Sequence, residues 1–149
     1  MEYIHKCVES RKKYEESVSK STKDINPAFA YALDLVQTKN KDCLRMSKDI
    51  FATIFQRTEE PNVKRDCLYY IAIALTKMND FSTALETCDN ALSVEPKNVQ
   101  FQKLRTEIQK RCNIAGAIGF GIIGTSAAVV IGSIVAIGLS LARHIDVNY

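Results

Sequence analysis

The sequence contains no tryptophan, only two histidines, and no glycine before Gly116. The missing glycines argue against an all-β fold, because the tight turns of β-hairpins depend on residues that adopt positive φ. The histidines, His5 and His144, form no nucleophile–base pair and no metal-ligand spacing with other residues. We therefore expect no catalytic residue, no metal site and no cofactor.

Disulfides and a secretory leader are not expected either. The five cysteines lie 21 to 36 residues apart, which gives neither a CxxC pair nor a compact disulfide framework. The first residues are polar and charged, without the apolar core of a signal peptide. These features predict reduced thiols and a cytosolic location for residues 1–112, which we call the head.

Nearly all of the charged residues lie in one part of the chain. Residues 1–112 carry 19 Lys+Arg and 16 Asp+Glu, which accounts for the whole net charge of +3, because the remainder has one residue of each sign. This small excess argues against nucleic-acid binding, which requires a basic patch or stripe.

The segment from Ile114 to Ala142 has 29 residues without a charge. A helix of that length would measure about 43 Å, more than the roughly 30 Å of a bilayer core. We predict a cytosolic helical domain at 1–112, a transmembrane anchor at 113–142 and a short basic-flanked tail at 143–149. A buried core helix is the alternative, although such helices are usually shorter.

Small side chains recur at every fourth position of this predicted span. They would let a second helix approach closely, so self-association into a homo-oligomer is a hypothesis. The alternative is that glycine and alanine are simply common in membrane helices. The residues are Gly124, Ala128, Gly132, Ala136 and Ser140.

The head shows a repeat of helical hairpins. Its three prolines, Pro27, Pro61 and Pro96, are 34 and 35 residues apart, the period of a tetratricopeptide repeat. Apolar residues recur at helical spacing in two stretches, 68–78 and 81–92, separated by Asn79-Asp80. The window 65–98 fits the repeat pattern well, with small Ala72, Ala84 and Ala91 where helices cross.

An earlier window, about 30–63, is a degenerate repeat with Ser47 near its small-residue position. Asn26 before Pro27 predicts the start of its first helix. Helices at about 3–19 and 99–112 would cap the array. The fold class is therefore all-α: a six-helix bundle with two tandem tetratricopeptide-like hairpins, plus one C-terminal transmembrane helix.

From about Asp24 through the anchor, the chain resembles the mitochondrial fission protein 1 family. The most specific stretch is Arg65-Asp66-Cys67-Leu68-Tyr69-Tyr70-Ile71-Ala72. Three further segments agree: Asp80-Phe81-x-x-Ala84-Leu85, Val94-Glu95-Pro96-x-Asn98, and Phe29-Ala30-Tyr31-Ala32-Leu33.

The resemblance implies a tail-anchored receptor in the mitochondrial, and often the peroxisomal, outer membrane. Its partner would be a dynamin-related GTPase, recruited directly or through an adaptor to divide the organelle. The implied binding surface is a concave groove formed by the first helix of each repeat. Its residues here would be Asp66, Tyr69, Ile73, Thr76 and Lys77, with Tyr31 and Leu35 from the first repeat.

This chain departs from the family after the Tyr70-Ile71-Ala72-Ile73 run. Where members commonly have Gly-Asn-Tyr-Arg, it has Ala74-Leu75-Thr76-Lys77, so an aromatic and a bidentate donor are missing. We expect a partner segment to bury apolar contacts with Tyr69 and Ile73 while Lys77 meets an acidic group. Because adjacent helical residues point about 100° apart, one of Tyr69 and Tyr70 is expected to be core packing.

A second function remains open from the residues. A membrane-tethered co-chaperone or import receptor would also use tetratricopeptide repeats to bind peptides. It usually needs three full repeats and a cluster of lysine and asparagine in the groove. This sequence has one good repeat and one degenerate repeat.

The anchor can be tested by deletion. Because residues 114–142 are the uncharged segment, we expect the full chain to coat mitochondria and a chain lacking Ile114–Tyr149 to be diffuse in the cytosol. Fluorescence microscopy of tagged chains measures this. Retention of the truncated head on the organelle would contradict the anchor.

Overall fold

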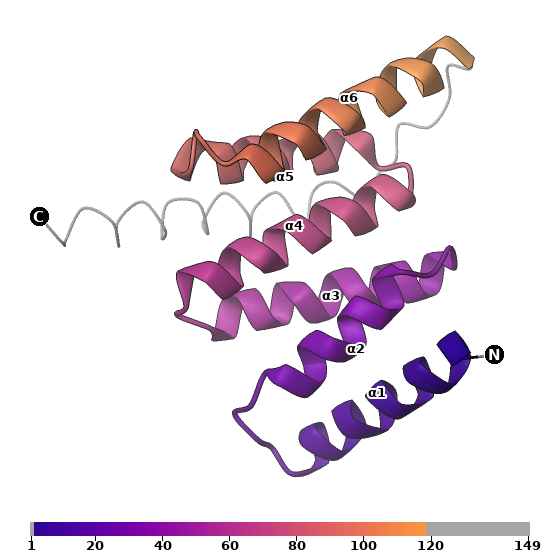
Figure 1. Cartoon of the computed structure of the whole chain (residues 1–149), viewed down its shortest axis with the longest axis vertical. Coiled ribbons are helices and arrows are strands. Elements are labelled where there is room, and N and C mark those ends of the chain that lie inside the picture. Colours follow the sequence, from indigo (N-terminus) through magenta and orange to yellow (C-terminus); the bar gives the residue numbers. More distant parts are fainter. Residues whose placement is uncertain (1, 119–149) are drawn as a thin grey trace, which may run out of the picture. The chain divides into compact units, whose positions relative to one another are not determined.

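The computed structural model describes the backbone of residues 2–118 and the side chains of residues 7–116. All of the regular secondary structure in this part of the chain is α-helical, as predicted (Figure 1). None of its helices is long and apolar enough to cross a membrane. The predicted transmembrane helix lies almost entirely outside the described residues. The helices are α1 (Glu2–Ser19), α2 (Asn26–Val36), α3 (Lys41–Arg57), α4 (Pro61–Lys77), α5 (Phe81–Val94) and α6 (Val99–Ile118).

The chain divides after Met78 into two compact units. In the first unit, α1 packs on α2, α2 on α3 and α3 on α4, each antiparallel to the helix before it (Figure 1). Helix α2 also contacts α4, and these two helices run in the same direction. In the second unit, α5 packs on α6.

Prolines mark where helices begin and end. Pro27 and Pro61 lie in the first turns of α2 and α4, where the missing N–H is not needed for a helical hydrogen bond. Pro96 follows the C-cap of α5 and precedes α6. The repeat period read from the prolines therefore gave the starts of α2 and α4 and the end of α5.

Side chains cap three other helix starts. The Asn40 side chain accepts hydrogen bonds from the N–H groups of Asp42 and Cys43 at 2.8 and 3.2 Å. Asn98 does the same for the first turn of α6, and Asp80 for α5. These contacts satisfy N–H groups that have no partner within the helix.

The predicted cap at Asn26 was wrong. The N-cap position of α2 belongs to Ile25, and Asn26 is already helical. The backbone and side-chain N–H groups of Asn26 both donate to Asp24 Oδ1, at 2.9 and 2.7 Å. The chain enters α2 through this turn on Asp24 instead of a side-chain cap.

Aromatic rings fill the centre of the first unit. Phe51 of α3 is fully buried, and its ring stacks on Tyr70 of α4 with centroids 5.2 Å apart. The same ring meets Phe29 of α2 edge-on at 5.2 Å. Three helices are thus joined by one set of ring contacts.

The serine of the degenerate repeat has a structural role. Ser47 is fully buried where α3 crosses α2, and its hydroxyl donates to the carbonyl of Ala32 at 2.8 Å. A small polar residue fits here because its hydroxyl is paired, which offsets the cost of burying it. Nearby, Val36, Leu44 and Ala74 form a buried cluster.

In the second unit, α5 carries small buried residues. Ala84 and Cys88 are fully buried, and Phe101 and Ile108 of α6 are buried as well. Arg105 of α6 pairs with Asp89 of α5 on the surface. Helix α6 continues beyond Cys112 to Ile118, so the first residues of the predicted anchor extend the last helix of the head.

The buried thiols give a test of the core. Cys67 and Cys88 are 0% exposed, and burial raises the pKa of each thiol to about 12. Because the thiolate is the reactive form, we expect both to resist maleimide near neutral pH. The half-buried Cys7, Cys43 and Cys112 should react.

Mass spectrometry of labelled peptides measures this, and unfolding in urea is the control that should expose all five thiols. Labelling of Cys67 or Cys88 as fast as Cys112 in the folded chain would show that the core is not closed.

The absence of glycine leaves a strained helix end at Ser21, with φ of 50° after α1. The N–H groups of Ser21 and Thr22 donate back to Val18 and Ser17 at 3.0 and 3.1 Å. Such a position usually holds glycine, because a Cβ is strained in the left-handed region.

We expect Ser21→Gly to raise the free energy of unfolding by about 0.5 to 1 kcal/mol, since it relieves this strain while giving the unfolded chain more freedom. Ser19→Gly, inside the last turn of α1, is the matched control and should lower it by a few tenths of a kcal/mol. Urea unfolding of the full chain in detergent micelles measures both. A loss of stability in Ser21→Gly would contradict the strain.

Candidate partner-binding surface

One side of α4 is partly accessible along its whole length. Asp66, Tyr69, Ile73 and Lys77 follow one another at helical spacing, and each is half-buried or exposed. We call these four residues the α4 open face. The other side of the helix is buried and consists mainly of Cys67, Leu68, Ile71, Ala72, Ala74 and Leu75.

The two tyrosines of α4 have different surroundings. Tyr70 stacks on the buried Phe51, and burial raises the pKa of its hydroxyl, with smaller contributions from Asp66 and Tyr69. The ring of Tyr69 meets that of Tyr70 edge-on, with centroids 5.5 Å apart. The two side chains leave α4 in directions about 100° apart around the helix axis. Tyr70 is therefore the packing residue of the pair.

Thr76 does not belong to the α4 open face. It is buried, with 6% exposure, and its hydroxyl donates to the carbonyl of Ala72 at 2.7 Å. This bond within the helix satisfies the hydroxyl, so the side chain presents no donor to a partner.

The predicted groove positions of the first repeat were wrong as surface positions. Tyr31 and Leu35 are buried, with exposures of 6% and 3%. The Tyr31 ring stacks on Tyr14 of α1 with centroids 5.3 Å apart, and burial raises the pKa of its hydroxyl.

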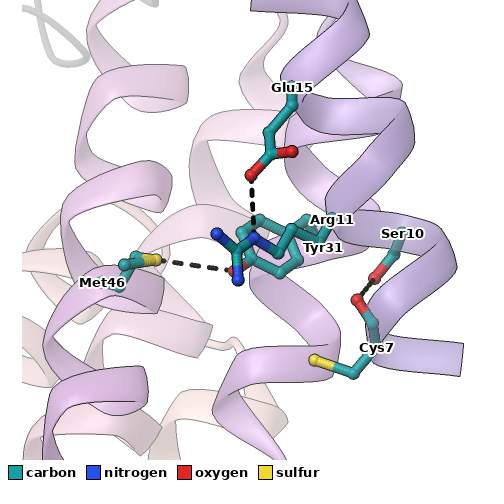
Figure 2. A network of polar contacts seen from close by, with 6 residues as sticks. All are labelled: Cys7, Ser10, Arg11, Glu15, Tyr31 and Met46. Carbon is teal, nitrogen blue, oxygen red and sulfur yellow. Dashed lines mark hydrogen bonds and ion pairs between the residues drawn. The ribbon is translucent and has the colours of Figure 1, made fainter. Parts of the chain in front are cut away.

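Figure 2 shows how closely α1 covers Tyr31. Arg11 lies beside the tyrosine and donates to Glu15 at 2.8 Å. The Tyr31 hydroxyl points to Met46 of α3, with 3.7 Å between oxygen and sulfur. Tyr31 is thus a contact among α1, α2 and α3.

Ala30 and Leu33 of α2 and its C-cap residue Gln37 are accessible, and the sequence reasoning missed them. Tyr31 and Leu35 correspond in burial to Ile71 and Leu75, a spacing of 40 residues instead of the 34 between Pro27 and Pro61. A difference of six residues turns a helix by about 240° beyond one full turn, so the proline spacing pairs residues from different sides of the two helices. Matching the buried residues of the two helices would have found the right set.

Lys77 has a partner within the first unit. Its Nζ donates to the backbone carbonyl of Val36, the last residue of α2. We predicted that this ammonium group binds an acidic group of a partner, but in the structure it already bonds a carbonyl of α2.

The described residues contain no group of three His, Cys, Asp or Glu side chains placed to hold a metal ion. The predicted packing residues of the span, Gly124 to Ser140, lie outside the described residues. What the structure presents is an accessible side of two helices with apolar and charged groups, which is suited to binding another protein.

Comparison with known proteins points to one family. Residues 65–116 match the model described as the Fis1 C-terminal tetratricopeptide repeat. The chain is 34% identical over 104 residues to the mitochondrial fission 1 protein of Debaryomyces hansenii, covering 70% of this chain and 67% of that protein. It is 30% identical over 127 residues to the mitochondrial fission 1 protein of Homo sapiens, covering 85% and 80%.

Solved structures share the fold. Yeast Fis1 in complex with an Mdv1 fragment matches with a TM-score of 0.66 and 22% identity, covering 75% of this chain and 86% of that chain. Fis1 from Saccharomyces cerevisiae alone matches with a TM-score of 0.62 and 23% identity, covering 74% and 85%.

These likenesses confirm the six-helix, tetratricopeptide-like fold and the resemblance seen in the sequence. The chain belongs to the mitochondrial fission 1 protein family.

Proposed function

We propose that this chain is a receptor for the organelle-division machinery on the mitochondrial outer membrane. The predicted span at 113–142 holds it there, with the helical head in the cytosol. It recruits a dynamin-related GTPase, directly or through an adaptor. The observation that carries this proposal is membership of the fission 1 family, and the proposal assigns the chain a binding role instead of catalysis.

The partner surface that we propose consists of the α4 open face with the accessible side of α2. Tyr69, Ile73 and Leu33 supply apolar area and Asp66 supplies a charge, while Lys77 lies at one end of the surface and bonds the Val36 carbonyl. A solved complex of yeast Fis1 contains a fragment of the adaptor Mdv1. By analogy, the occupant here is an adaptor segment that lays an apolar helical face on this surface.

Two further parts of the proposal concern the membrane. The location that we propose includes peroxisomes, and the resemblance seen in the sequence supports this part. The small residues of the predicted span, from Gly124 to Ser140, support self-association by close helix packing.

Proximity labelling from the intact chain on mitochondria tests the proposed function. We expect a dynamin-related GTPase or its adaptor among the labelled proteins. Labelling of chaperones or imported precursors, with no division protein, would favour the co-chaperone or import-receptor function instead.

Ile73→Glu tests the partner surface. Ile73 is half-buried and packs against the cluster of Val36, Leu44 and Ala74, with one side accessible. A charge there should weaken binding of the partner identified by proximity labelling by at least about tenfold, because the carboxylate would lose its water in the interface. Binding of the full chain in detergent micelles measures this.

Gln56→Glu on the exposed side of α3 is the matched control, since it adds the same charge. Circular dichroism checks the fold of both variants. Unchanged binding in Ile73→Glu would contradict the surface, and loss of helicity would show that Ile73 belongs to the core.

A further inference from the structure

The C-terminal ends of α2 and α4 meet at Lys77. This residue is the last of α4, and its Nζ donates to the carbonyl of Val36, the last residue of α2. The contact joins positions 41 residues apart in the sequence. It lies at one end of the proposed partner surface, beside Ile73 of the α4 open face.

No glycine follows the last turn of α2 to form a C-terminal cap. Its C-cap residue Gln37 keeps helical geometry, with φ of −72°. The carbonyls of Asp34 and Leu35 accept from the N–H groups of Gln37 and Thr38 at 3.3 and 3.1 Å, and the Thr38 hydroxyl also donates to Leu35 at 2.8 Å. The Val36 carbonyl is bonded by Lys77 of the neighbouring helix.

Electrostatics favours a cation at this place. Because α2 and α4 run in the same direction, the negative ends of both helix dipoles lie together here. Each end is equivalent to about half a negative charge, so two parallel ends repel each other. The ammonium group of Lys77 offsets this repulsion while it bonds one of the last carbonyls of α2.

We propose that Lys77 is a positioning residue: it clamps the end of α2 to the end of α4 and thereby sets the spacing of the two helices that form the partner surface. Its effect on binding acts through this spacing and not through an ion pair with the partner. The effect on α2 stands by itself, whereas the effect on binding rests on the proposed function.

Hydrogen exchange of the full chain in detergent micelles tests the clamp. In Lys77→Met we expect amides at the end of α2, such as Gln37 and Thr38, to exchange roughly fivefold faster or more. Amides of α6 should be unchanged. Lys77→Arg should restore protection, because arginine keeps both the charge and the donor.

Lys39→Met is the matched control, since it removes the same charge from the exposed link after α2. Unchanged exchange at Gln37 and Thr38 in Lys77→Met would overturn the proposal. If that variant unfolds, Lys77→Gln replaces it, and exchange that rises equally in α2 and α6 would likewise overturn the clamp.

Binding distinguishes positioning from a direct ion pair. The probe is the yeast Mdv1 fragment containing the N-terminal extension and coiled coil. We expect Lys77→Met to weaken binding about fivefold, with the salt dependence of the affinity unchanged. A reduced salt dependence would identify an ion pair with the partner and overturn the positioning role. Failure of the unaltered chain to bind this fragment would count against the adaptor contact, while the exchange result would still decide the clamp.

Discussion

The first unit depends on the packing of Phe51 between α2 and α4. Its fully buried ring stacks on Tyr70 and meets Phe29 edge-on, so one side chain of α3 joins the first helices of both repeats. Aromatic pairs of this geometry add about 0.5 to 1.5 kcal/mol each beyond the area they bury. Tyr69 precedes Tyr70 and contacts its ring, so the stack also orients the accessible side of α4.

The helices of the head end without the glycine that commonly follows the last turn. Ser21 and Asn79 adopt positive φ after α1 and α4, with φ of 50° and 66°. At the end of α2, the Thr38 hydroxyl and the Lys77 ammonium bond the last carbonyls. Side chains thus satisfy backbone groups that glycine caps satisfy elsewhere. Where such a side chain comes from another helix, closing the end also joins the two helices.

Sequence reasoning placed the surface of α4 better than that of α2. In α4, polar Asp66 and Lys77 mark the accessible side, so the periodicity separates the two faces. Helix α2 has apolar residues around nearly its whole circumference, with Asp34 as its single charge, and that carboxylate is buried. Its pattern therefore indicates a helix without indicating which side is covered.

The sequence by itself determined the positions of the helices, the hairpin repeat and the family, because proline positions and helical periodicity act locally along the chain. Only the tertiary structure decided that α1 covers Tyr31 through Tyr14 and that Lys77 bonds the end of α2. Both contacts join different helices, and which faces meet depends on how side chains of different size fill the space between them.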